Sequence, residues 1–365
     1  RRTLRLEHAH WPPADLPLGV ILSAFPRVHN TLESARGIEF TAAVARIEHR
    51  GMPVFERAYG VTRDDARAKP VYCDTRFDLA SLTKLFVATL ALRLVADGTF
   101  TLDEPLWRIL PEWKDGERAT VTVRMLLAHN SGMNSGADYR TILDENVERF
   151  ALRSELLARP GERVIYSDLG FIVLGVAIER ATGTSLNALV RRTFGRSLGF
   201  RPRFAERVAI PATEEDPWRG RVAGFVHDEK AFLMGGVAGH AGLFGTAADV
   251  AAMTDSYLGP QRLRRTLPLE LLHEATHEQA GDPVLRRGLG WALKTSDDNS
   301  CGRWMAPSSF GHTGFVGTCV WADPVRDLQG VLLTNAVYFG RDATPNPGPG
   351  LRVRFYEAMV EDLRL

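Results

Sequence analysis

The sequence predicts an α+β protein in which a central antiparallel sheet is flanked by helices and joined to a mostly helical lobe. Three observations support this: strand-like segments follow the first helix, amphipathic helical segments fill the middle, and strands return before a closing helix. Both ends can then share one sheet covered by helices. We expect residues 1–113 together with 285–365 to form the sheet domain, residues 114–284 to form a mainly helical domain, and a functional site to lie between them.

The first elements along the chain are a helix and a hairpin. Residues 25–36 place Val28, Leu32 and Ala35 at helical spacing, and Gly37 ends the run. Residues 40–48 and 54–61 are rich in strand formers and flank the turn at Arg50 and Gly51. These two strands are expected to open the antiparallel sheet.

The middle of the chain has a helical period. Residues 81–97 carry apolar side chains three and four apart before Gly98, which predicts a helix with Ser81 at its start. Further helices are expected over residues 123–128, 168–181, 186–194 and 246–257. The texture changes after about residue 288, where 311–322 and 329–337 predict strands around the Asp323–Pro324 turn, and 351–363 predict the closing helix.

Composition excludes several classes of protein. The chain has 365 residues, 45% of them hydrophobic and 24% charged, as in ordinary globular proteins. With 45 basic and 44 acidic residues it offers no field for nucleic acid. No run approaches the roughly 20 apolar residues of a membrane span, and the separated cysteines Cys73, Cys301 and Cys319 are expected to be packed thiols. We expect a periplasmic or secreted protein if an upstream signal has been removed and a cytoplasmic one otherwise; the oligomeric state stays open.

The strongest motif is S-x-x-K at Ser81 and Lys84, at the opening of the predicted helix. Residues three apart share a helical face, so the hydroxyl and the amine are expected to be neighbours. The first turn of a helix also favours a developing oxyanion. A lysine among apolar neighbours loses its proton more readily, which predicts a base for Ser81.

Two further motifs follow in order along the chain. Tyr166, Ser167 and Asp168 precede a helix, and His312–Thr313–Gly314, followed by Phe315, falls on a predicted strand. With these three boxes the chain resembles the class C serine β-lactamases, the penicillin-binding DD-peptidases, the D-aminopeptidases and the family VIII carboxylesterases, which share one fold. Three other stretches carry the resemblance, namely LLAHNSGM at 126–133, GGVAGHAGLF at 235–244 and FGHTGFVGTCVWADP at 310–324.

The resemblance implies a role for each matching residue. Ser81 is expected to attack a carbonyl, while Lys84 and Tyr166 move protons to and from it. The oxyanion is expected between the backbone N–H groups of Ser81 and Phe315. His312, Thr313 and Gly314 are expected to line the strand on which the acyl group docks, and Asp168 to occupy the asparagine position of the family. No metal or cofactor is implied, and the expected partner is a small-molecule or peptide acyl donor.

Two residues depart from the family pattern. Asp168 replaces an amide with a carboxylate, which accepts hydrogen bonds but donates none when ionised, and it is expected to pair with Lys84 or attract a cationic group. His312 replaces the lysine of typical β-lactamases, so the charge near the substrate is expected to depend on pH near neutrality. Both departures predict at most weak β-lactamase activity.

Two other motifs compete with this assignment. Residues 195–199 spell G-x-S-x-G, but a helix rather than a strand is predicted before the serine, unlike a nucleophile elbow. His273 and His277 lie in H-E-x-x-H, which on a helix can bind zinc. His129 and His240 are expected to fix loops, and His227 with Asp228 to point to opposite faces of an extended segment.

We therefore expect a serine hydrolase that cleaves ester or amide acyl donors through an acyl-Ser81 intermediate, most like a DD-peptidase or carboxylesterase. Two alternatives stay open: a zinc metalloprotease centred on His273 and His277, and a penicillin-binding sensor that acylates without turnover. The natural substrate, whether ester, D-amino-acid peptide or β-lactam, is not fixed by these motifs.

Overall fold

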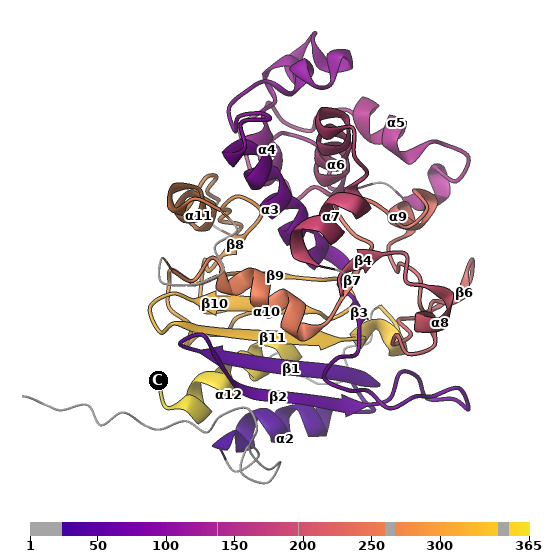
Figure 1. The fold of residues 1–365 in the computed structure, drawn as a ribbon, viewed down its shortest axis with the longest axis vertical. Helices are drawn as coiled ribbons and strands as arrows, with labels where there is room; N and C mark the ends of the chain where they lie inside the picture. The colour runs from indigo at the N-terminus through magenta and orange to yellow at the C-terminus, as the bar shows by residue number, and fades with distance from the viewer. Residues whose placement is uncertain (1–23, 137, 196, 260–266, 283, 342–349) are drawn as a thin grey trace, which may run out of the picture.

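A six-stranded antiparallel sheet forms the base of the molecule and joins the two ends of the chain (Figure 1). The computed structural model describes residues 24–136, 138–195, 197–259, 267–282, 284–341 and 350–365. In spatial order the strands are β2 (Met52–Gly60), β1 (Ala42–His49), β11 (Leu328–Thr334), β10 (Cys319–Asp323), β9 (Phe310–Thr313) and β8 (Ala292–Leu293). The N-terminal hairpin thus pairs directly with a C-terminal strand, which confirms the expected shared sheet.

Helices cover both faces of this sheet. Helices α2 (Pro26–Ala35) and α12 (Leu351–Leu363) pack on one face, and α10 (Ala247–Asp255) packs on the other (Figure 1). Successive residues of a strand point to opposite faces, so Val44 of β1 joins the core with α10 while Ala43 and Ala45 join the core with α2 and α12. Burial on both faces explains why these strands are almost continuously apolar.

Most of the remaining helices form a second layer of the molecule beyond the sheet, whereas α8 (Phe204–Arg207) lies beside the sheet (Figure 1). The helices of the second layer are α3 (Thr83–Ala96), α4 (Val123–Leu127), α5 (Val147–Arg153), α6 (Asp168–Thr182), α7 (Leu186–Phe194), α9 (Glu229–Leu233) and α11 (Leu269–Thr276). Short 3-10 turns lie at η1 (Ala80–Leu82), η2 (Leu106–Arg108), η3 (Pro111–Trp113), η4 (Glu117–Thr120), η5 (Tyr139–Thr141) and η6 (Ala336–Phe339). The expected helices over 123–128, 168–181, 186–194, 246–257 and 351–363 are all confirmed.

Two small sheets connect the layers. Strands β3 (Phe77–Asp78), β7 (Leu243–Gly245) and β4 (Gly199–Phe200) form one of them, and β5 (Glu215–Asp216) pairs with β6 (Gly220–Arg221) in the other. The first places the chain just before Ser81 against the chain just after His240, because β3 and β7 are hydrogen-bonded neighbours. Neither sheet was expected from the sequence, since strands of two or three residues carry too little pattern.

Two sequence expectations about element boundaries are wrong. Residues 311–322 form two strands, β9 and β10, joined by a turn at 314–318, because Gly314 donates its backbone N–H back to the Thr318 carbonyl (2.7 Å). Ser81 does not begin an α-helix but lies within η1, and α3 begins at Thr83. Both deviations lie in the two turns that carry Ser81 and Phe315.

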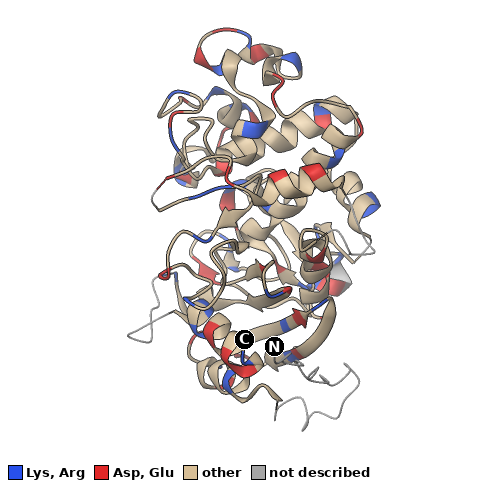
Figure 2. Ribbon diagram, turned by 90° about the vertical axis from the view of Figure 1, so that its left-hand side faces the viewer, with Lys and Arg blue, Asp and Glu red and all other residues tan. Residues whose placement is uncertain are grey.

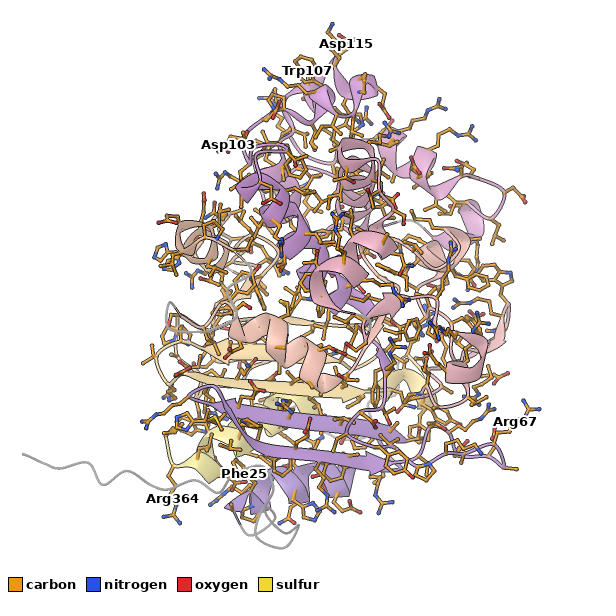
Figure 3. The ribbon with its side chains drawn as sticks, viewed as in Figure 1. Phe25, Arg67, Asp103, Trp107, Asp115 and Arg364 are labelled. Atoms are coloured by element: carbon orange, nitrogen blue, oxygen red, sulfur yellow. The ribbon has the colours of Figure 1, made fainter. Side chains whose placement is uncertain are left out.

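The expected division of the chain at 113/114 and 284/285 stays a prediction. One hydrophobic core runs continuously from the sheet into the helices. Helix α10, expected in the helical domain, packs on the sheet, and Trp107, expected in the sheet domain, lies far from the sheet at the end of the helical layer (Figure 3). We therefore propose a boundary that assigns α10 to the sheet layer and residues 100–113 to the helical layer.

Three expectations drawn from composition can be compared with the structure: the mixed charge, the packed cysteine thiols and the lack of a membrane-spanning run. Figure 2 shows basic and acidic residues interspersed over both layers in this view. Cys73, Cys301 and Cys319 are free thiols, and the last two are buried. Among the described residues no single helix has the length and apolar character to cross a membrane; α6 and α7 together would, but they meet at 83°.

Candidate active site

Ser81 sits on a constrained turn between β3 and α3. The preceding residue, Ala80, has φ +46°, a left-handed conformation that a non-glycine residue rarely adopts. The Asp78 carboxylate holds it by accepting the Ala80 backbone N–H (2.8 Å), and the Leu79 N–H donates to the Leu243 carbonyl (2.9 Å). Surrounding structure therefore imposes a strained conformation immediately before Ser81, as is common at functional sites.

Lys84 makes three hydrogen bonds inside the protein. Its Nζ donates to Ser81 Oγ (2.9 Å), to Asp168 Oδ1 (2.8 Å) and to the His240 carbonyl (3.1 Å), and its side chain is 0% exposed. An ammonium group has three donors, so all of them are used. The structure thus brings together the hydroxyl and the amine that the S-x-x-K spacing predicted.

The resting Lys84 is an ammonium ion. Burial by itself would lower its pKa, but the Asp168 carboxylate and then the Tyr166 phenol outweigh burial, so the pKa of Lys84 is raised. Burial would likewise raise the pKa of Asp168, yet the cationic groups around it, Lys84 first, lower that pKa. The expectation that apolar neighbours would make Lys84 release its proton is therefore wrong for the resting site, because the expected pairing with Asp168 forms and outweighs the effect of burial.

Tyr166 lies between Lys84 and the strand that bears His312. Lys84 Nζ is 4.9 Å from the centre of the Tyr166 ring, and the His312 and His129 ring centres are 5.9 and 4.6 Å away. The next residue, Ser167, caps α6 by accepting the Gly170 N–H (2.8 Å) and donates its own N–H to His129 Nδ1 (3.0 Å). His129 therefore fixes the loop before α6, as the sequence predicted.

His312 stays uncharged. Burial, followed by the nearby charges of Arg287 and Lys84, lowers the pKa of His312 well below its ordinary value. Its Nδ1 lies 2.8 Å from the Thr313 carbonyl, which assigns the ring proton to Nδ1 as a donor. The expectation of a charge that changes near neutral pH is wrong, because the side chain is enclosed rather than open to water.

The turn after His312 and Thr313 packs directly on the turn that holds Ser81. A Cβ on Gly314 would lie 2.1 Å from Thr318 Oγ1 and 2.9 Å from the Leu79 carbonyl, so only glycine fits there. Thr318 Oγ1 also donates to the Leu79 carbonyl (3.1 Å). Phe315 follows Gly314 directly and is 57% exposed at the edge of the same cavity.

A cavity of about 490 Å³ opens beside Ser81, large enough for a small ligand. The predicted residues on its wall are Ser81, Tyr166, His312, Thr313, Gly314 and Phe315. Three arginines, Arg286, Arg287 and Arg352, also line it. Arg287 is buried, its guanidinium lies 5.2 Å from the Tyr166 ring centre, and its Nε has no hydrogen-bond acceptor among the described residues.

The sequence missed a ring of charged side chains behind Lys84. Asp168 Oδ2 lies 3.4 Å from Lys230 Nζ, Lys230 Nζ lies 3.1 Å from Asp228 Oδ2, and Asp228 Oδ1 lies 2.7 Å from His240 Nε2. His240 closes the ring because its carbonyl accepts from Lys84. The sequence predicted only that His240 fixes a loop and that Asp228 and His227 point to opposite faces. Asp228 and His240 are 12 residues apart, so no local pattern joined them.

Glycines bring His240 to this position. A Cβ on Gly239 would lie 2.0 Å from the Phe171 carbonyl, and a Cβ on Gly175 would lie 3.2 Å from the Gly239 backbone. Two glycines thus let the chain before β7 touch helix α6. This close approach explains the glycines of the 235–244 stretch and delivers the His240 carbonyl to Lys84.

Carboxylate clusters elsewhere are neutralised by cations of the protein. Asp168 and Asp228 with His240 are near enough for a metal, but Lys84 and Lys230 lie between them. Glu214, Asp216 and Glu229 form a second cluster. Arg341 Nε bonds Glu214 Oε2 (2.8 Å) and Arg219 Nε bonds Asp216 Oδ2 (2.6 Å). Arginine therefore fills the place that a cation would take.

The competing motifs lie away from this cavity. His273 and His277 stack on each other with ring centres 3.6 Å apart, α11 ends at Thr276, and Glu274 of the same motif pairs with Arg124. Ser197 of G-x-S-x-G follows helix α7, and its hydroxyl donates to Asp249 Oδ1 (2.6 Å). Neither arrangement has the neighbours that its catalytic role requires.

The comparison with protein families agrees with the site. The β-lactamase family model matches residues 32–349, and the chain belongs to this family. Its esterase and carboxypeptidase members are serine hydrolases, and the chain is accordingly a serine hydrolase.

Two similar proteins carry different names. Esterase EstB of Burkholderia gladioli is 31% identical over 355 residues, covering 84% of this chain and 89% of that protein. A putative D-alanyl-D-alanine carboxypeptidase of Escherichia coli K12 is 29% identical, covering 72% and 69%.

Solved structures show the same fold. EstCE1, a hydrolase with promiscuous acyltransferase activity, aligns with a TM-score of 0.74 at 20% identity over 93% of this chain and 99% of that chain. A penicillin-binding protein homologue from Caulobacter crescentus aligns with a TM-score of 0.73, also at 20% identity, over 93% and 97%. The α+β fold with its antiparallel sheet is therefore that of the β-lactamase and transpeptidase group.

Proposed function

We propose that this serine hydrolase cleaves small esters or amides through an acyl-Ser81 intermediate. One observation carries the proposal: Ser81 Oγ, Lys84 Nζ and the Tyr166 ring converge beside strand β9 at the wall of one cavity. The resemblance to an esterase and to a putative D-alanyl-D-alanine carboxypeptidase supports carbonyl substrates of both kinds. His312 in place of lysine supports at most weak β-lactamase activity.

Acylation begins when Ser81 Oγ bonds to the substrate carbonyl carbon. Its proton passes to the pair formed by Lys84 and Tyr166 once that pair has lost one proton between them, as phenolate with ammonium or as phenol with amine. The backbone N–H groups of Ser81 and Phe315 receive the oxyanion. The tetrahedral adduct then breaks its bond to the leaving group, which takes the proton from the pair.

Deacylation repeats these steps with water as the nucleophile. The pair accepts a proton from water, the new oxyanion forms in the same place, and Ser81 leaves as the alcohol after it regains a proton. Asp168 holds the Nζ of Lys84 in place throughout. His312 and Thr313 provide the uncharged strand along which the acyl group lies.

Covalent labelling tests this proposal. A fluorophosphonate probe should label the chain once per molecule, and p-nitrophenyl butyrate should be hydrolysed. Ser81→Ala should abolish both, while Ser197→Ala, the serine of the other motif, should leave both unchanged. Labelling that survives Ser81→Ala would defeat the assignment.

The two alternatives predict other outcomes of the same assays. A zinc enzyme would lose ester hydrolysis on chelation and on His273→Ala, although neither imidazole lines the cavity. A sensor would give a penicilloyl-Ser81 adduct that persists for hours in mass spectra, with no ester turnover. Turnover that resists chelation supports the hydrolase.

A further inference from the structure

A closed ring of side chains surrounds the ammonium of Lys84. Starting from Lys84 it passes through Asp168, Lys230, Asp228 and His240, and it returns through the His240 carbonyl. Each charged neighbour along the ring has the opposite sign. The side chains come from α3, α6, α9 with its cap residue, and the loop before β7, so tertiary structure alone brings them together.

Asp168 creates a difficulty for catalysis that an amide would not. A full negative charge 2.8 Å from Lys84 Nζ favours the ammonium form of Lys84. The proposed reaction needs the Lys84–Tyr166 pair to give up one proton before it can accept one from Ser81. An unbalanced carboxylate would oppose that loss, because the Lys84 side chain that it contacts is 0% exposed and water does not reach it to screen the charge.

The ammonium of Lys230 can balance the negative charge of Asp168. Its Nζ faces the second oxygen of Asp168 (3.4 Å) and one oxygen of Asp228 (3.1 Å), and its side chain is only 10% exposed. Asp228 is held by His240 Nε2 on one side and accepts the Ala231 N–H (2.8 Å) at the cap of α9 on the other. The Lys230 ammonium is therefore fixed at the far side of Asp168 from Lys84.

We propose that Lys230 is a positioning residue whose ammonium balances the Asp168 carboxylate, so that Lys84 and Tyr166 can release a proton and act as a base. The inference rests on the proposed function and names a residue that supports it from outside the substrate cavity. The residue does not touch substrate. It acts through Asp168, and the departure from the family asparagine makes it necessary.

The groups that face Lys84 determine the direction of the effect. They are Ser81 from η1, Asp168 and the Phe171 ring from α6, Tyr166 from the preceding loop, and the His240 carbonyl. His129 and His312 also interact with Lys84, but both are neutral because burial lowers the pKa of each. The Arg287 guanidinium faces the other member of the pair, 5.2 Å from the centre of the Tyr166 ring. Removal of the Lys230 cation leaves Asp168 to act on Lys84 alone, so the apparent pKa of the Lys84–Tyr166 pair rises.

The experiment measures kcat/KM for p-nitrophenyl butyrate from pH 5 to 10. Lys230→Met should move the acidic limb of the profile upward by about one pH unit, with a loss of about tenfold at neutral pH. Lys230→Arg keeps the charge and should remain within about threefold of the parent. Lys114→Met, at an exposed lysine of the helical layer, is the control and should not change the profile.

A second comparison tests whether Lys230 acts by balancing the charge of Asp168 or only by supporting the local structure. With Asp168→Asn in place, the carboxylate that Lys230 balances is gone, so adding Lys230→Met should change kcat/KM less than about threefold. Equal loss from Lys230→Met in both backgrounds would overturn the inference, as would a Lys230→Met profile that superimposes on the parent. If the single Lys230→Met variant does not fold, a loss greater than about threefold on adding Lys230→Met to Asp168→Asn would overturn the inference by itself. Activity in Ser81→Ala would instead overturn the proposed function.

Discussion

The guanidinium of Arg287 lies 5.2 Å from the centre of the Tyr166 ring, on the wall of the substrate cavity. Burial lowers the pKa of Arg287, and the Tyr166 phenol offsets part of this lowering. No carboxylate of the described residues pairs with this guanidinium. A buried cation without a counter-ion beside a nucleophile is suited to bind a negative charge on a substrate.

Arg287→Met should therefore discriminate between substrates by charge. We expect kcat/KM for p-nitrophenyl hemisuccinate to fall about tenfold more than kcat/KM for p-nitrophenyl butyrate, because only the first carries a carboxylate. Arg286→Met is the control, since Arg286 Nε is already paired with Glu278 (2.7 Å). Equal losses on both esters would show that Arg287 does not select charge.

Lys84 and Tyr166 should be needed for acylation itself. Lys84→Ala and Tyr166→Phe should each slow the acylation burst with p-nitrophenyl butyrate by about 100-fold or more, because both groups transfer the Ser81 proton. Tyr72→Phe, which removes an exposed phenol, should leave the burst unchanged. A normal burst in Tyr166→Phe would limit that residue to packing.

Protein stability should fall in mild acid because of His129. Burial, then the charges of Arg287 and Lys84, lowers the pKa of His129 well below its ordinary value in the folded protein. The unfolded chain takes up a proton near pH 6.5 and the folded protein does not, so the free energy of unfolding falls as pH drops below that point, by up to about 1.4 kcal/mol per pH unit.

His129→Asn tests this sign. An asparagine can still accept the Ser167 N–H but cannot titrate, so urea unfolding between pH 7.5 and 5.5 should show a flatter dependence on pH than the parent. A steeper slope in His129→Asn would contradict the account.

Gly239→Ala should reduce both stability and activity. The new Cβ would lie 2.0 Å from the Phe171 carbonyl, so the 239–240 segment must move and the His240 carbonyl must leave Lys84. We expect a loss of about 2 kcal/mol or more in unfolding free energy, together with a fall in kcat. Gly350→Ala serves as the control, because its new Cβ would have no atom of the described residues within 4 Å.

The predicted parts of the site are those set by local spacing. Ser81 and Lys84 are three residues apart at a helix start, and His312, Thr313 and Gly314 form a contiguous motif on a predicted strand, so short stretches of sequence identified them. The expected α-helix at Ser81 was wrong because the strained turn at Ala80 depends on Asp78 and on β7. The β9–β10 turn was missed for a similar reason, since Thr318 and the Leu79 carbonyl fix it.

The sequence alone determined which groups are available: a hydroxyl, an amine and a phenol in the order of a known family, on elements whose periods are visible locally. Tertiary structure decided their charge. Lys84 is an ammonium and His312 is neutral because of burial and of partners such as Asp168, which is 84 residues away from Lys84. Electrostatic energy depends on distance and on exclusion of water, and neither quantity is contained in the spacing of residues along a chain.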